Sequence, residues 1–140
     1  MIPDPLLALR ALVAADVDVA ALAGTRVFAA ELPDSEAAVM PRAAAVIAAS
    51  GGPPDLGYAP LAHRRIDVRT YGVTPLGAMQ LHLAVHAVLK SLRRTPRLGV
   101  LLHSAALDAG PVAMREPEAG AEWPFVFASY ELLASEQAVA

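Results

Sequence analysis

The sequence of 140 residues contains no cysteine. This absence excludes disulfides, thiolate metal sites and cysteine nucleophiles, and it fits a reducing compartment. Lysine is almost absent too: Lys90 is the only one, no lysine-rich block occurs, and the formal net charge is −3. The electrostatic footprint of a nucleic-acid-binding protein is therefore missing, and we expect no sequence-specific binding to nucleic acid.

Long apolar runs and charged residues are also scarce. No apolar run approaches the ~20 residues that a membrane span requires, and the N-terminus lacks the basic leader of a signal peptide, so we expect no membrane contact. Hydrophobic residues make up 56% of the chain and charged residues only 18%. A domain with so few charges is expected to bury more than its own core, and self-association is the ordinary reason.

Helix signals occur at the start and in the middle of the chain. Asp4 can cap a helix that begins at Pro5 and runs to about Ala15, and a short second helix follows, which Gly24 is suited to end. A long amphipathic helix is predicted from residue 75 to about residue 92, with Thr74 as its cap. Its predicted core stripe consists of Leu81, Val85, Val88 and Leu92.

Alternating apolar residues and turn signals predict the strands. We expect a connection at 33–41, a long loop at 51–62, and a turn-rich hairpin region at 108–122 that holds a short strand near 112–115. The five main strands are expected at 26–32, 42–50, 63–72, 100–107 and 123–134.

Strands in runs, with helices kept apart from them, indicate an α+β fold. We predict one domain over residues 1–140, with a frayed tail at 135–140. Its sheet should be mixed, mostly antiparallel and of about five strands, packed by the N-terminal helix and the one long central helix.

Two histidines, His82 and His86, lie one turn apart on the long helix and could both reach one zinc ion. The metalloprotease motif needs Glu directly after the first His, whereas Leu83 stands there, and a third ligand is missing. We therefore favour a pair at the core boundary or at an interface, and we expect no metal and no cofactor. A metal-dependent or ligand-binding α+β domain remains the alternative.

The strand at 63–72 places different residues on its two faces. Ile66, Val68 and Thr70 share the face expected to pack on the long helix. The other face carries His63, Arg65, Asp67, Arg69 and Tyr71. Asp67 between two arginines could form an anion site, but a solvated or subunit-facing charge ladder is the better interpretation. No Gly-x-Ser-x-Gly elbow, phosphate loop or calcium loop occurs, so we expect no enzymatic activity.

Some residues are better suited to contacts with other chains. Leu76 and Leu83 lie opposite the predicted core stripe, beside Met79, and would form a second buried face against a neighbouring subunit. The loop at 51–62 would be an arm anchored by large apolar side chains. The residues predicted to make such contacts are Leu56, Tyr58, Arg65, Asp67, Arg69, Leu76, Met79 and Leu83.

Four stretches, in this order, carry a resemblance to a known family: "LLALRALVAADVDVAALAGTRVF", "ELPDSEAAVMPRAAAVIA", "RRIDVRTYGVTPLGAMQLHLAVHAVL" and "GPVAMREPEAGAEWPFVFASYELL". Their order and spacing, over roughly Leu6 to Leu133, resemble the tail-completion or tail-terminator proteins of long-tailed bacteriophages and gene transfer agents, the head-to-tail joining group. No single motif among them is diagnostic.

The resemblance implies a non-enzymatic virion protein, assembled in the host cytoplasm and located at the head-proximal end of the tail. Such proteins cap the tail tube as a ring, usually a hexamer, end tail polymerisation and provide the joint to the head connector. The implied partners are further copies of the chain, the tail tube protein and the connector or neck protein. Another neck component, such as a head-completion or stopper protein, is the alternative within this class.

Overall fold

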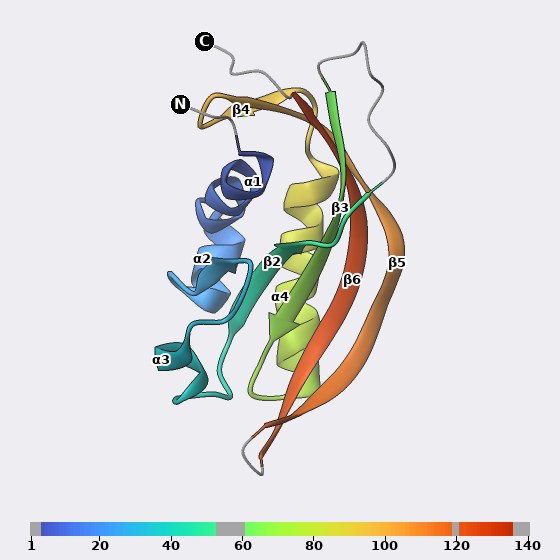
Figure 1. Cartoon of the computed structure of the whole chain (residues 1–140). Helices are drawn as coiled ribbons and strands as arrows, with labels where there is room; N and C mark the ends of the chain where they lie inside the picture. Colours follow the sequence, from blue (N-terminus) through green and yellow to red (C-terminus); the bar gives the residue numbers. More distant parts are fainter. Residues whose placement is uncertain (1–3, 53–60, 119–120, 136–140) are drawn as a thin grey trace.

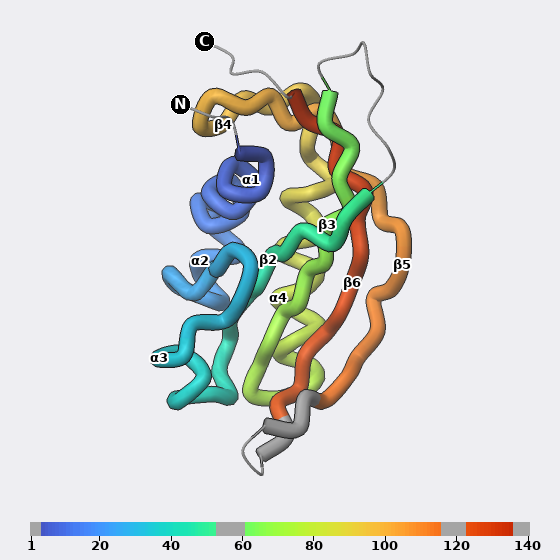
Figure 2. Tube along the Cα trace, in the orientation of Figure 1, coloured from blue at the N-terminus to red at the C-terminus, as the bar shows by residue number. Residues whose placement is uncertain are grey.

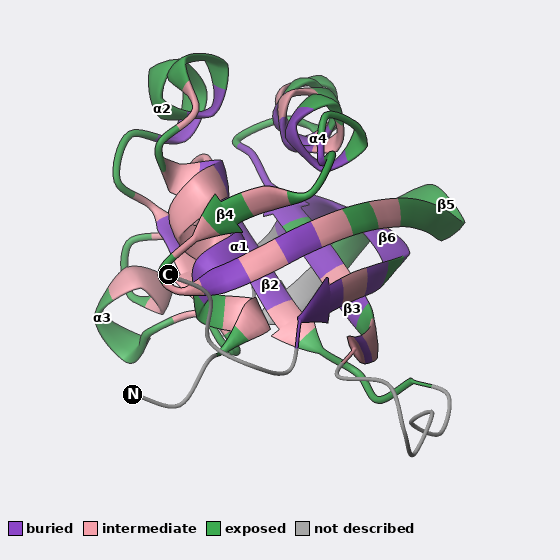
Figure 3. Ribbon diagram, turned by 90° about the horizontal axis from the view of Figure 1, so that it is seen from above, coloured by how far each residue is buried: buried purple, intermediate pink, exposed green. Residues whose placement is uncertain are grey.

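One six-stranded sheet carries three helices on the same face, as the computed structural model shows for residues 4–52, 61–118 and 121–135 (Figure 1). The helices are α1 (Pro5–Ala14), α2 (Val17–Ala23), α3 (Asp34–Ala37) and α4 (Pro75–Lys90). The strands are β1 (Val27–Ala29), β2 (Ala44–Ala49), β3 (Leu61–Tyr71), β4 (Thr95–Arg97), β5 (Val100–Glu118) and β6 (Ala121–Ser135). Helices α1, α2 and α4 cover one face, whereas α3 lies toward the other (Figure 3).

Helices α1, α2 and α4 are the three that the sequence predicts, and each begins at a capping side chain. Asp4 Oδ1 accepts hydrogen bonds from two backbone N–H groups at the start of α1, and Asp16 does the same for α2. The Thr74 hydroxyl accepts one from Gly77 N–H, at 3.1 Å, at the start of α4. Gly24 ends α2 with a φ of 60°, a conformation that suits glycine.

The sheet runs in the order β1-β2-β3-β6-β5-β4. Only the β1–β2 pair is parallel, so the expectation of a mixed, mostly antiparallel sheet is confirmed. The two central strands, β3 and β6, come from distant parts of the chain, and Val68 faces Ala128 across them. The strands curl past α4, which Figure 2 follows along the backbone.

The structure differs from the expectation in the connections. Helix α3 falls inside the predicted connection, β4 was not predicted, and β3 begins inside the predicted loop at Leu61. The hairpin region predicted at 108–122 does hold a strand at 112–115, but the expected turns are wrong over much of its length, because β5 continues through Gly110 and Pro111. Register shifts between Leu107 and Val112 accommodate these residues as irregularities in a strand that stays paired with β6.

The expected frayed tail is wrong at its first residue. Ser135 belongs to β6, is buried, and accepts a hydrogen bond from Leu101 N–H on β5 at 3.0 Å. Residues 136–140 lie outside the described part of the chain.

The main core lies between the sheet and the three helices. Ile66 and Val68 of β3 are buried there, as predicted. Thr70, on the same face, donates a hydrogen bond from its hydroxyl to Ala78 O at 3.2 Å and ties β3 to α4. Gly72 makes the tight turn between them possible, because a Cβ there would lie 2.5 Å from Ala78 N. The predicted stripe of α4 is buried in full: Leu81, Val85, Val88 and Leu92.

A second, smaller cluster lies on the opposite face of the sheet. Tyr71 packs between Trp123 and Phe125, with ring centroids 6.3 and 5.5 Å away, and Val46 completes the cluster. It is covered by three residues of the segment that joins β1 to β2: Leu32, Ala37 and Met40. We call this face, which α1, α2 and α4 leave uncovered, the open face.

Candidate interaction surfaces

Arg65, Asp67 and Arg69 of β3 lie on the open face, but the partners of the first two come from neighbouring strands. Arg65 Nε donates to Ser129 Oγ at 3.2 Å, and that hydroxyl donates to Asp67 Oδ1 at 2.5 Å. The Arg65 guanidinium also pairs with Asp108 of β5 at 2.8 Å. Within the described part of the chain Asp67 forms no ion pair with Arg65 or Arg69, so the predicted ladder becomes a network across three strands.

Arg69 lies farther along the same face. Its guanidinium carbon is 5.7 Å from the centre of the Phe125 ring, a cation–π contact. Residues 4–52, 61–118 and 121–135 provide no carboxylate that pairs with it. Its charge therefore remains available at an exposed position.

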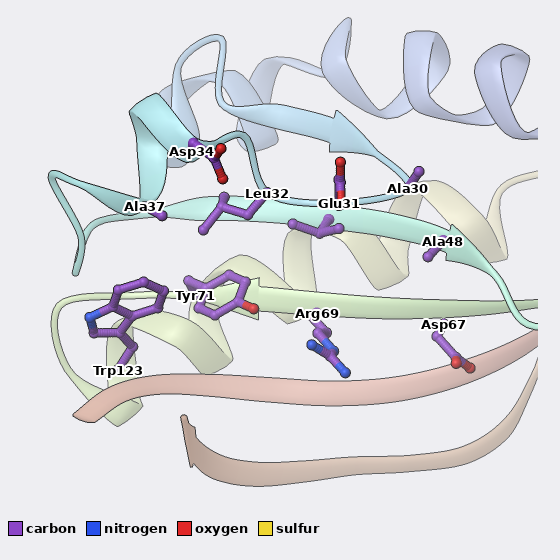
Figure 4. Close-up of a pocket in the computed structure, with 11 residues that line it drawn as sticks. Ala30, Glu31, Leu32, Asp34, Ala37, Ala48, Asp67, Arg69, Tyr71 and Trp123 are labelled. Atoms are coloured by element: carbon purple, nitrogen blue, oxygen red, sulfur yellow. The ribbon is translucent and has the colours of Figure 1, made fainter. Parts of the chain in front are cut away.

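A cavity of about 370 Å³ opens beside Arg69, between β3 and the segment that joins β1 to α3 (Figure 4). Glu31 comes from that segment and Asp34 from the start of α3, whereas Asp67 and Arg69 come from β3. Trp123 forms part of the wall, together with Tyr71. The sequence analysis missed this cavity. The only available signal was the acidic segment 31–36, which has no periodicity of its own.

The outer side of α4 presents the apolar residues that the sequence predicts. Leu76 is 71% exposed, Leu83 is 57% exposed, and Met79 beside them is half-buried. Val73, just before the helix, is also exposed, at 68%. Leu56 and Tyr58, the predicted anchors of the loop, lie outside the described residues.

The two histidines of α4 differ in environment. His82 is only 2% exposed, so its predicted place at the core boundary is wrong, whereas His86 is half-buried. A hydrogen bond of 2.7 Å joins His86 Nδ1 to the Tyr130 hydroxyl, and the two histidine rings lie 5.8 Å apart. His82 Nδ1 has no hydrogen-bond partner among the described residues. Burial, and secondarily the neighbouring His86, lower the pKa of His82, and burial raises the pKa of Tyr130 to about 12.

Within the described ranges, no group of three His, Asp or Glu side chains is arranged to hold a metal ion. None of the described helices is long and apolar enough to cross a membrane.

The sequence analysis also missed a cluster of basic residues in the segment 90–97, which we call the basic end. Lys90, Arg93, Arg94 and Arg97 fall within eight residues at the end of α4 and in β4, and no Asp or Glu occurs anywhere from 68 to 107. The sequence carried this signal in its distribution of charge, although its overall charge is negative.

The sequence matches no family model and no curated protein sequence. Its fold is similar to that of a protein chain in the virion of a native gene transfer agent particle. The TM-score is 0.61, the sequence identity is 17%, and the match covers 94% of each chain. At this identity the likeness concerns the fold.

Proposed function

We propose that this protein is a structural component of a phage-like particle, without enzymatic activity, and that it forms the ring that ends the tail. The observation that carries the proposal is the fold shared, over almost the whole length of both chains, with a protein of a gene transfer agent virion. The order of the four sequence stretches that resemble tail-completion proteins supports the same role independently.

The surfaces suit a protein that works by contact. A ring of identical subunits needs two different surfaces on each subunit that fit each other, and it needs further faces for the tail tube and the head connector. The apolar stripe of α4, with Leu76 and Leu83 exposed, and the charged open face supply surfaces of different chemistry. In this role six copies would close on the head-proximal end of the tail tube, stop its polymerisation and present a face to the connector.

Deletion of the gene from a strain that produces the particles tests this role. We expect filled heads and separate tails of uneven length, because nothing would end tube growth, and a plasmid copy should restore joined particles. Tails of uniform length that remain unjoined would point instead to a stopper protein of the neck. Normal, joined particles would refute both roles.

The position within the particle has its own test. Gold-labelled antibody against an epitope tag on the complementing copy should bind where the tail meets the head. Labelling along the tube or at the distal tip would contradict the proposed position.

A further inference from the structure

The basic end carries charge that the rest of the chain does not neutralise. Four of the eleven Lys and Arg residues lie in the segment 90–97. Lys90, Arg93 and Arg94 are exposed and Arg97 is half-buried. In the part of the chain that the structure describes, none of the four forms an ion pair. The segment lies at one end of the molecule, where α4 ends and β4 begins (Figure 1).

Local structure accounts for only part of this charge. One guanidinium nitrogen of Arg93 donates to Lys90 O at 3.0 Å and to Leu92 O at 2.7 Å, which places a cation at the C-terminus of α4, where it is favoured. Asp16 lies near Ser91 and Thr95, but its carboxylate is engaged as the cap of α2. Lys90 and Arg94 face solvent, whereas the Nε of Arg97 is buried and has no hydrogen-bond partner among the described residues.

The cavity on the open face has the complementary character. Its three carboxylates, on Glu31, Asp34 and Asp67, outnumber its single cation, Arg69. Glu31 and Asp34 are exposed and form no ion pair with any described residue. A guanidinium suits such a site, because it binds carboxylates through paired hydrogen bonds.

We propose that the basic end of one copy docks at the cavity of the next copy, with Arg93 and Arg94 facing Glu31 and Asp34. This inference rests on the proposed ring, because it names the contact that would join its subunits. The cavity is lined in part by α3, and the basic end adjoins β4; these two elements lie in the lower and upper parts of the molecule in Figures 1 and 2. A contact between different surfaces of identical chains repeats from copy to copy, as a closed ring requires.

Charge reversal tests the contact directly. One variant carries Arg93→Glu and Arg94→Glu, a second carries Glu31→Arg and Asp34→Arg, and a third carries all four changes. The wild type should have a mass above the 14.6 kDa of one chain in light scattering at low salt, and each double variant should remain at one chain. The third variant should associate again, because both sides of the contact are reversed.

The expected effect of each double variant is a rise of about tenfold or more in the dissociation constant, and added salt should weaken the wild-type contact as it screens the charges. Arg115→Glu is the control, because Arg115 is an exposed arginine of β5 that neither lines the cavity nor belongs to the segment 90–97. Circular dichroism of every variant verifies that the fold is intact.

Three results would overturn the inference: a wild type that stays a single chain, double variants that associate like the wild type, or a variant with all four changes that does not regain association. Association of the variant with all four changes, together with a wild-type mass for the Arg115→Glu control, would support it. Binding of the basic end to double-stranded DNA, with the mass unaffected by reversal, would assign those arginines to DNA instead. The deletion experiment is independent, so a tail defect without an effect of charge reversal would refute this contact and leave the proposed function standing.

Discussion

The two faces of the central β3–β6 pair differ in composition: one is apolar and the other is partly charged. On the helix side, Ile66 and Val68 belong to one continuous core that α4 closes. On the open face, the described residues form an apolar cluster near Tyr71 and Phe125, and a cavity extends from this cluster to the charged residues Asp67 and Arg69. The contrast teaches that one face stabilises the subunit, whereas the other keeps side chains available for partners.

The largest expected effect separates the two sides of α4. Leu81→Ala should lower the free energy of unfolding by about 2–5 kcal/mol, because it empties a fully buried position. Leu83→Ala, two residues away on the exposed side, should change it by about 0.5 kcal/mol or less. Urea unfolding followed by circular dichroism measures both. Equal losses would mean that α4 packs with a different side toward the sheet.

His82 tests how strictly apolar the helix side must be. His82→Gln should cost about 1–3 kcal/mol, because an amide would be buried where the imidazole already lacks one partner. His86→Gln is the comparison, since that position is only half-buried. If the exchange of both histidines leaves thermal stability unchanged, the predicted place of the pair at the core boundary or at an interface would be restored.

The same residue predicts a pH dependence. Because burial lowers the pKa of His82, the unfolded chain takes up a proton near pH 6.5 while the fold still excludes it. Stability should therefore be complete above about pH 6.5 and fall as the pH drops below it. His82→Leu should flatten this part of the curve. An unchanged pH profile in that variant would assign the acid sensitivity to other groups.

One chemical change made on both faces sharpens the comparison further. Val85→Ala removes two methyl groups from the helix-side core and should cost about 2 kcal/mol. Val46→Ala removes the same groups from the small cluster and should cost about 1 kcal/mol, because Val46 borders the cavity, where water already has access. Denaturant midpoints of the two variants give the difference directly. A larger loss at Val46 would make the open face a second full core.

The smallest effect belongs to the charged part of the open face. Asp108→Ala removes the partner of Arg65, and both side chains are more than a third exposed. Such pairs contribute about 0–1 kcal/mol, so the melting temperature should hardly change, and salt should reduce even this difference. A marked destabilisation would show that the network through Ser129 organises the sheet.

Sequence reasoning predicted those parts of the fold that depend on local periodicity. The alternation at Ile66 and Val68 assigns the faces of β3, and the Thr74-Pro75 pair begins α4. It failed for the segment that contains Leu32 and Ala37, because those residues are partly buried by contact with strands distant in the sequence and follow no local period.

The predictions for His82 and for Gly110 and Pro111 were also wrong because of contacts between distant parts of the chain. His82 lies outside the narrow apolar stripe of α4, but the helix packs on β3, β5 and β6 as well as α2, so its buried arc is wider than the stripe. Gly110 and Pro111 are typical of a turn, yet pairing with β6 on both sides retains them within a bulged strand. The cavity of the open face could not be predicted, because it exists only once residues 30–37 fold over β3.

The central position of β6 has a consequence for synthesis of the protein. Strand β3 must wait for a partner that the ribosome makes some fifty residues later, and α4 emerges before β5 and β6, two of the three strands that it packs against, have been made. Pairings between distant segments form slowly, and apolar surfaces left uncovered in the meantime invite aggregation. The nascent chain therefore passes through a vulnerable interval. Slower synthesis at low temperature, or a chaperone that holds α4, should raise the yield of folded subunits more than any change to the finished surface.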